Sequence, residues 1–235
     1  MFLNALRNLF ASKTTNKLSK KGISRRLELL GLEERITPSN SPIIVDTDLD
    51  LVDPSDNLTS LREAIHTANS TAGNDTIDFN FLSGIPFPYI ITLGSALPNI
   101  LDATATITGG TVGTLTINGL GSSDLTISGN NGVSSRDFNI FNIDTDGDLT
   151  ISGVTVSGAK TSSYGAGFFN SGNLTVSNST ISGNTTSGNN GSGSGGGIYN
   201  GTATLNIANT IIANSTSGGD YSGAGTVNLI SGATA

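Results

Sequence analysis

Short segments in which apolar and polar residues alternate recur through the second half of the chain. Each begins with Leu, and Thr, Ser or Asn alternate with aliphatic residues, which is the pattern of a half-buried β-strand. These segments start at Leu115, Leu125, Leu149, Leu174 and Leu205. The last four leucines are 24, 25 and 31 residues apart. A period in this range indicates an array of repeated units, each too short to fold alone.

Stacking of these units predicts an all-β fold, a parallel β-helix. Units about 4.8 Å apart would align their inward residues in apolar ladders, and stacked amides would hydrogen-bond along the axis. A β-sandwich is the competing fold, but the matching Leu positions favour the β-helix. A second strand follows three of the Leu segments, at Val154-Thr-Val, Ser179-Thr-Ile and Thr210-Ile-Ile. The predicted ladders are Leu149–Leu174–Leu205, Ile151–Val176–Ile207 and, at the corner before the strand, Asn142–Asn170–Asn200.

A helix is predicted upstream of the repeats, over residues 60–69. Ser60 and Glu63 have the spacing of a capping box, and the apolar residues that follow share one face. Short strands are predicted on either side, at Ile43–Val45 and Asp75–Phe79. Because the end of a β-helix exposes strand edges and an open core, we expect this helix to cover one end.

The C-terminal segment after Leu205 shows no comparable cap in its sequence. Either the chain is a fragment of a longer gene product, or its last coil meets a partner, which would allow end-to-end association. We expect this part of the chain to be the least protected in hydrogen exchange.

Composition and charge narrow the possible functions. The chain has 235 residues, with 31 Gly, one His, no Cys and only 12% charged residues. The lack of Cys excludes disulfides, Cys-based zinc sites and thiol catalysis, and a single His excludes a multi-histidine metal site. Residues 1–40 carry a formal charge of +5 and residues 41–235 carry −12. We therefore expect a basic arm on an acidic body, and the body's charge disfavours binding to nucleic acid.

The basic leader, residues 1–40, is expected to be largely flexible and partly helical, and to act in targeting or wall association. It has no unbroken apolar stretch of the kind found in secretory signal peptides, and no segment approaches the length of a transmembrane span. Its later part resembles a short leader on surface and secreted proteins of planctomycete bacteria, with Glu-Glu-Arg where Glu-Asp-Arg is typical. An ordinary basic amphipathic helix is the alternative. The matching residues are Leu27, Glu28, Leu32, Glu33, Glu34, Arg35 and Pro38.

A more specific resemblance lies in the predicted helix and the strand after it. Residues Ser60 to Ile65, Ala68, Asn69 and Asp75 to Ile77 resemble the N-terminal module of bacterial surface β-helix proteins, although Thr59 stands where that family often has Cys. The phrases Gly-Gly-Ile-Tyr-Asn and Ser-Thr-Ile-Ser-Gly-Asn resemble polymorphic outer-membrane-type repeats. The resemblance implies a right-handed, pectin-lyase-like solenoid at the cell surface or outside the cell. Its implied parts are a leader (1–40), an N-terminal cap (41–102) and β-helix repeats (103–235).

Candidate chemistry is concentrated in one acidic turn. Asp144, Asp146 and Asp148 place oxygen ligands at alternate positions, which could hold calcium, although an ordinary turn rich in Asp and Gly has the same pattern. The same alternatives apply to the acidic loop between Asp46 and Asp56. His66 falls on the polar side of the predicted helix, where we expect an exposed structural residue rather than a base.

An enzyme of this fold would need groups that converge on one face, such as paired carboxylates or a calcium-holding acid cluster with a base. Beyond residue 81 the chain has seven acidic residues and only Arg136 and Lys160 as bases. We therefore expect a non-catalytic structural or adhesive scaffold, with extracellular polysaccharide or other surface proteins as partners and no cofactor other than calcium. The alternative is a lyase or hydrolase acting on acidic polysaccharides. The aromatic residues, 6% of the chain, are scattered, which argues against a stacked sugar-binding platform.

Overall fold

The computed structural model describes residues 41–230, except for 108–109, 130–131, 133–135 and 188–193. The basic leader, residues 1–40, lies outside the described residues. In the described part the chain forms 20 strands and one helix. The predicted all-β class is therefore confirmed at this level. Among these residues no helix combines the length and the apolar character needed to cross a membrane.

Most strands belong to three parallel sheets, which we name A, B and C. Sheet A contains, in spatial order, β1 (Ile43–Val45), β2 (Asp75–Phe79), β6 (Leu115–Asn118), β9 (Asp148–Ser152), β13 (Asn173–Ser177), β17 (Thr204–Ala208) and β20 (Thr226–Leu229). Sheet B contains β3 (Tyr89–Thr92), β7 (Leu125–Ser128), β10 (Thr155–Ser157), β14 (Thr180–Ser182) and β18 (Ile211–Ala213). Sheet C contains β8 (Phe141–Ile143), β12 (Phe168–Asn170), β16 (Ile198–Asn200) and β19 (Tyr221–Ser222).

Two small strand pairs complete the described sheets. One is parallel and joins β11 (Lys160–Thr161) to β15 (Thr185–Thr186). The other is antiparallel and joins β4 (Thr106–Ile107) to β5 (Gly110–Thr111).

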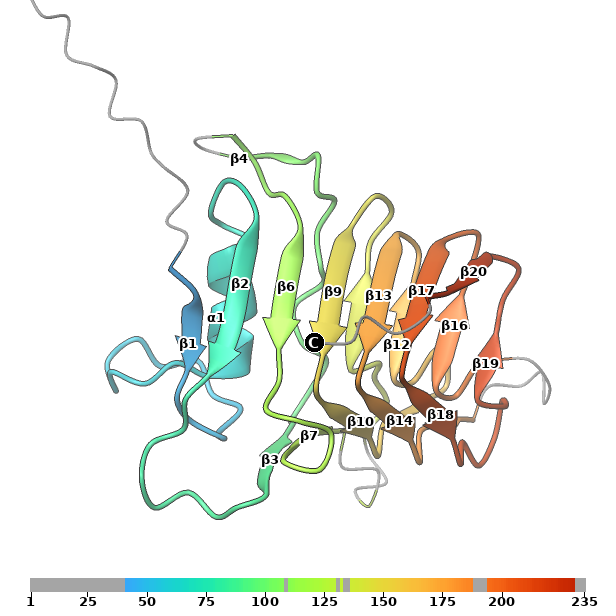
Figure 1. Ribbon diagram of the computed structural model, residues 1–235. Helices are drawn as coiled ribbons and strands as arrows, with labels where there is room; N and C mark the ends of the chain where they lie inside the picture. The colour runs from blue at the N-terminus through green and yellow to red at the C-terminus, as the bar shows by residue number, and fades with distance from the viewer. Residues whose placement is uncertain (1–40, 108–109, 130–131, 133–135, 188–193, 231–235) are drawn as a thin grey trace, which may run out of the picture. The chain divides into compact units, whose positions relative to one another are not determined.

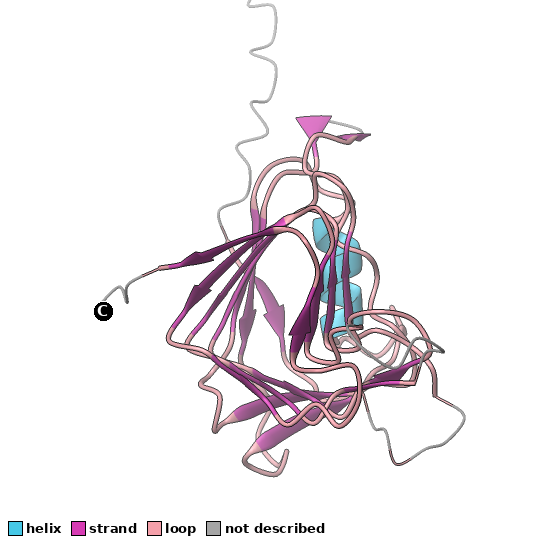
Figure 2. Cartoon of the chain, turned by 90° about the vertical axis from the view of Figure 1, so that its right-hand side faces the viewer, coloured by secondary structure: helices cyan, strands magenta, loops and turns pink. Residues whose placement is uncertain are grey.

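The chain visits the sheets in a repeating order. From β9 it passes to β10 in sheet B, to β11, and to β12 in sheet C before it returns to sheet A at β13. We call each such passage a circuit. Two further circuits follow, β13–β16 and β17–β19, and β20 then re-enters sheet A. In Figure 2 the sheets surround a common interior. In Figure 1 the strands of sheet A run side by side from β1 to β20, with the helix beside β1 and β2.

The two predicted apolar ladders are present. Leu149, Leu174 and Leu205 are aligned in neighbouring strands of sheet A, as are Ile151, Val176 and Ile207. The three leucines are fully buried, while the Thr and Asn residues between the ladder positions are partly exposed. The period-2 pattern therefore identified the inward face correctly.

The place of Leu125 differs from the prediction. Leu115, not Leu125, aligns with Leu149 in sheet A, whereas the strand of Leu125 belongs to sheet B and aligns Thr126 with Thr155. The two Leu segments at 115 and 125 are thus the first and second strands of one circuit. Because Leu125-Thr-Ile-Ser and Leu149-Thr-Ile-Ser are identical, their residues alone could not assign them to different sheets.

The predicted amide ladder is shorter than expected. Asn170 and Asn200 are aligned and fully buried, and the Nδ2 of Asn170 donates to the Oδ1 of Asn200 at 2.8 Å. Asn142 instead aligns with Phe169 on the outer side of sheet C. The cause is a one-residue difference in register, because Phe141 stacks on Phe168 in the interior, with ring centroids 5.0 Å apart. A shift of one residue moves a side chain to the opposite face of a strand.

The predicted helix is α1 (Leu61–Ala68), with Ser60 as its N-cap. The capping box is confirmed, because the Ser60 hydroxyl accepts from the Glu63 amide and the Glu63 carboxylate accepts from the Ser60 amide. The apolar face of α1 is buried and belongs to the same core as the ladders of the sheets. The helix therefore packs against β1 and β2 and continues the core at that end of sheet A (Figure 1).

Candidate functional site: a groove at the corner between sheets A and B

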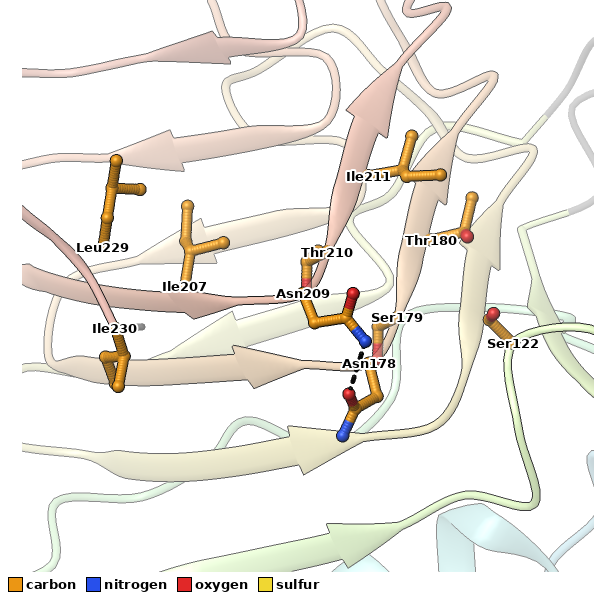
Figure 3. Close-up of a pocket in the computed structure, with 10 residues that line it drawn as sticks. All are labelled: Ser122, Asn178, Ser179, Thr180, Ile207, Asn209, Thr210, Ile211, Leu229 and Ile230. Carbon is orange, nitrogen blue, oxygen red and sulfur yellow. Dashed lines mark hydrogen bonds between the residues drawn. The ribbon is translucent and has the colours of Figure 1, made fainter. Parts of the chain in front are cut away.

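A groove of about 530 Å³ lies where the chain turns from sheet A into sheet B near the C-terminal end of the described residues (Figure 3). Two successive corners contribute to it, at Asn178–Ser179 and at Asn209–Thr210. Strand residues from β14, β17, β18 and β20 complete the wall. The lining residues are Ser122, Asn178, Ser179, Thr180, Ile207, Asn209, Thr210, Ile211, Leu229 and Ile230.

The backbone at these corners is left-handed. Asn178 has a φ of 48° and Asn209 a φ of 42°, and Gly153 occupies the same corner of the preceding circuit with a φ of 65°. Asn and Gly are the residues that adopt this conformation at least cost. The side chains of the two asparagines stack, and the Nδ2 of Asn209 donates to the Oδ1 of Asn178 at 2.8 Å (Figure 3). The corner thus gives the groove a polar amide rim.

The rest of the groove is open, and its lining combines hydroxyl side chains with exposed apolar ones. Ile207 and Leu229 lie side by side on neighbouring strands (Figure 3), and Leu229 is 82% exposed. Ile211 and Ile230 are exposed as well. The ten lining residues carry no ionisable side chain. The groove can therefore bind by apolar contact and by hydrogen bonds to neutral groups, but its lining supplies no acid or base.

The three aspartates of the predicted calcium turn take different positions. The Oδ1 of Asp144 accepts from the Nδ2 of Asn99 at 3.0 Å. Asp146 is exposed and has a φ of 61° in the turn, and Asp148 is the first residue of β9. Within the part of the chain that the structure describes, no group of three or more acidic or His side chains is gathered in the manner of a metal site.

The second acidic loop, between Asp46 and Asp56, is tied to α1. Asp50 and Arg62 form a two-pronged ion pair, with Nε–Oδ1 and Nη2–Oδ2 distances of 2.9 Å. Asp50 also accepts from the Gly94 amide at 2.7 Å, and Arg62 donates to the backbone oxygens of Ser95 and Ala96. The side chain of Asp50 is only 7% exposed. From the sequence, Arg62 is expected to pair with nearby carboxylates, and the structure confirms such a pair and identifies its partner as Asp50.

Other carboxylates accept hydrogen bonds from backbone amides and hydroxyl groups. Two hydrogen bonds from Ser55 lower the pKa of Asp53, and Thr104 lowers the pKa of Asp102 in the same way. Hydrogen bonds from Ser162 lower the pKa of Asp137. The Oδ1 of Asp220 accepts from the Ser215 amide at 2.7 Å. Asp53, Asp102 and Asp220 are thus local turn acceptors, as is common for Asp at turns, whereas Asp137 joins two segments that are 25 residues apart.

His66 lies on the exposed side of α1, as expected. The groove itself was missed by the sequence analysis. A signal for it was present, because Asn178-Ser-Thr-Ile and Asn209-Thr-Ile-Ile occupy equivalent places in two repeats. What the sequence could not supply was the exposure of Leu229, which depends on what packs above its strand.

Comparisons with protein-family models, with curated proteins and with solved structures gave no match for this chain.

Proposed function

We propose that the chain is a right-handed parallel β-helix that serves as a non-catalytic scaffold or adhesion module, displayed at the cell surface or secreted. The observation that carries the proposal is the repeated circuit through sheets A, B and C with inward residues in register. A parallel strand connection is right-handed in nearly all known cases, which supports the hand. Stacked circuits produce a stiff rod whose outer faces can present contacts to a partner.

The polar residues support a structural role. Thr, Ser and Asn face outward on sheets A and B, as in the aligned residues Thr150, Thr175 and Asn206. Several of the acidic side chains described above are held by partners within the fold, as Asp50 is by Arg62 and Asp144 is by Asn99. Every residue of the segment Ser60 to Ile65 is buried, caps α1 or forms the ion pair with Asp50. This supports a role of the segment as the cap of a rod.

Location is tested by fractionating cells that express the full chain or a form without residues 1–40. The proposal expects the full chain in the surface or extracellular fraction and the shortened form in the cytosol. Identical cytosolic location of both forms would contradict display and export together.

The absence of catalysis is tested on an acidic polysaccharide. We expect no depolymerisation of polygalacturonate by the purified chain, with or without calcium. If depolymerisation occurs and is abolished by Asp146→Asn or Asp148→Asn, the lyase or hydrolase alternative replaces the scaffold proposal.

Calcium at Asp144, Asp146 and Asp148 is part of the proposal only as a stabilising ion. Its test compares melting of the chain in millimolar calcium with melting in a chelator. A higher melting temperature in calcium, lost in Asp146→Asn, would support the ion. An unchanged melting temperature would remove calcium from the proposal.

At the end of the sheets that carries the groove, the proposed partner is a second copy of the chain. β18 and β20 are the outermost strands of sheets B and A in the described part of the chain, and outermost strands offer backbone groups for pairing. Exposed Ile211 and Leu229 lie beside these edges. Sedimentation velocity should show concentration-dependent self-association, weakened by Leu229→Asp. The control is Leu82→Asp, which changes an equally apolar exposed residue, 52% exposed, far along the chain. If the parent chain, Leu229→Asp and Leu82→Asp sediment equally at every concentration, self-association at this end is contradicted.

A further inference from the structure

Three aromatic rings from two successive circuits meet on the outer side of sheet C. Phe169 in β12 and Tyr199 in β16 are aligned neighbours, with ring centroids 5.5 Å apart and an angle of 17° between the rings. Tyr164, in the segment before β12, packs against Tyr199 with centroids 4.7 Å apart. We call Tyr164, Phe169 and Tyr199 the aromatic strip.

The aromatic strip faces away from the core. On either side of Phe169 the residues Phe168 and Asn170 are fully buried, and Ile198 and Asn200 flank Tyr199 in the same way. Alternation along a strand therefore turns Phe169 and Tyr199 outward. Both are partly exposed, and Tyr164 is 40% exposed. The interior of sheet C has its own stacked rings, Phe141 and Phe168, so the strip is not needed to fill the core.

The backbone that carries Tyr164 is held in place. The Nδ2 of Asn139 donates to the backbone oxygens of Tyr164 and Gly165. Gly165 has a φ of 63°, and its amide donates to the Ser194 oxygen at 2.9 Å. A Cβ at this glycine would lie 2.2 Å from the Phe168 oxygen, so the turn accepts only Gly. The backbone at Tyr164 is thus fixed, and its ring packs on Tyr199, before any ligand binds, which lowers the entropic cost of binding.

The residues next to the strip are small or polar. In the neighbouring strands Asn142 aligns with Phe169, and Ser222 aligns with Tyr199. On the segment beside Tyr164, the carboxylate of Asp137 accepts from the Ser162 amide at 2.6 Å. The exposed parts of these rings, with the amide of Asn142 and the hydroxyl of Ser222 on neighbouring strands, offer both apolar contact and hydrogen bonds. This is the combination that Tyr provides at many binding surfaces.

The scattered aromatic residues of the sequence argued against a sugar-binding platform, but the fold brings three of them together. We infer that the aromatic strip is a binding platform for a neutral polysaccharide of hexopyranose units. Such rings have an apolar C–H face that packs on aromatic π-faces, whose quadrupole attracts the partly positive hydrogens. Their hydroxyl edges bond to amides and carboxylates. The platform is an open outer face rather than an enclosed pocket, which suits a polymer that passes across it. The inference rests on the adhesive role proposed above and names its ligand class.

The negative charge of residues 41–235 favours a neutral polysaccharide over an acidic one. Residues 41–235 contain three basic and fifteen acidic residues, a formal charge of −12. A field of this sign repels a polyanion such as polygalacturonate and leaves a neutral glycan unaffected.

The test is affinity electrophoresis of the full chain in native gels that contain hydroxyethyl cellulose, galactomannan or polygalacturonate. We expect retardation by at least one of the two neutral polymers and none by polygalacturonate. The double variant Tyr164→Ala/Phe169→Ala should weaken the apparent affinity at least tenfold. Tyr164→Phe should keep it, because the stacking face is retained. The matched control is Phe87→Ala, which removes an aromatic ring that is 67% exposed outside the strip and should leave retardation unchanged.

Several outcomes would overturn the inference. These are no retardation by either neutral polymer, retardation by polygalacturonate alone, equal loss in Phe87→Ala, or loss in Tyr164→Phe. Undiminished retardation of the double variant would do the same. If the double variant melts earlier than the parent chain, the single variant Tyr164→Ala replaces it, because this exposed side chain lies outside the strands. The assay uses purified protein, so a cytosolic location would contradict the proposed display without touching this inference. A surface-located chain that binds no glycan would contradict only the inference.

Discussion

β1 and β20 are the two outermost strands of sheet A in the described part of the chain, and their surroundings differ sharply. At the β1 end the apolar face of α1 is buried, and Val45, Leu61 and Ile65 are at most 1% exposed. At the β20 end Val227 is 41% exposed and Leu229 is 82% exposed. Both ends have inward-facing aliphatic residues, so residue type does not explain the difference.

The difference comes from what packs beside each outermost strand. Ile151, Val176, Ile207 and Leu229 occupy one ladder, yet only the first two are fully buried. Each ladder residue is covered by the circuit that follows it. At the β1 end the helix takes the place of a circuit, and its position is fixed by polar contacts, chiefly Arg62 with Asp50. Burial in this molecule is therefore a property of neighbours rather than of the single residue.

The largest expected contrast is in native-state hydrogen exchange. We expect the amides of β9 and β13 to exchange only through global unfolding, because both neighbours of each strand are present. The amides of β18 and β20 should open with free energies several kcal/mol lower, since each has one strand neighbour in the described structure. Exchange measured by mass spectrometry in dilute monomer checks this. Protection of β20 equal to that of β13 would contradict the comparison.

Truncation within one ladder should show the same contrast. Ile151→Ala removes a fully buried side chain between two covered levels and should lower the free energy of unfolding by about 4 kcal/mol. Leu229→Ala, at the same inward position of the last described level, should change it by less than about 0.5 kcal/mol. Urea denaturation of both variants gives the two values. Similar losses for both would mean that Leu229 is covered in solution.

The helix end can be weakened through its ion pair. Arg62→Ala leaves the buried carboxylate of Asp50 without its partner and should lower the free energy of unfolding by about 3 kcal/mol. Exchange protection in β1 and β2 should fall with it, so that the two ends become more alike. Lys160→Ala, which removes a cation elsewhere, serves as the control and should cost less than about 0.5 kcal/mol. A neutral Arg62→Ala variant would show that apolar packing alone holds the helix.

The smallest expected effect is the pH dependence of the helix cap. Burial raises the pKa of Glu63, but hydrogen bonds from the Ser60 and Asp53 amides outweigh it and lower the pKa below the ordinary 4.5. A lowered folded-state pKa contributes stability above the ordinary pKa, and this contribution disappears as the pH falls through the folded value.

Glu63→Gln should therefore cost about 0.5 kcal/mol at neutral pH, because it removes a charge from the first helical turn. The cost should shrink in melting experiments carried out progressively below pH 4.5. The pKa of Asp75 shifts in the opposite direction, because burial raises it more than a hydrogen bond from Thr71 lowers it. Asp75→Asn should therefore not reproduce this pH profile. A cost of Glu63→Gln that grows on acidification would contradict the assignment.

The sequence predicted the elements more reliably than their partners. Ser60, Glu63 and the apolar spacing after them specify α1 locally, so the helix could be read from a few residues. The ladder of Leu149, Leu174 and Leu205 followed from alternation and repeat length. Leu125 was misplaced because strands in sheets A and B share one sequence pattern, and only the length of the connections separates them.

Contacts between circuits were the part that sequence could not supply. Asn142 is not part of the amide ladder because the stacking of Phe141 on Phe168 sets the register of the two strands. Phe141 could equally have aligned with Phe169, one residue further on, and the sequence does not decide between the two. The groove and the aromatic strip each combine residues from different circuits. Tyr164 and Tyr199 are far apart in the chain, and they meet only because a circuit lies between them.

The corner between sheets A and B has a consequence for how such a chain can change its length. Gly153, Asn178 and Asn209 have the same left-handed backbone conformation in three successive circuits. The chain therefore turns from sheet A into sheet B in the same way each time. A duplication of DNA that encodes one whole circuit would insert a level between two existing ones and join both through matching ladders. A duplication of half a circuit would break every ladder it touches. Whole circuits could therefore be added without breaking the alignment of the ladders, so that the molecule can lengthen only in whole steps.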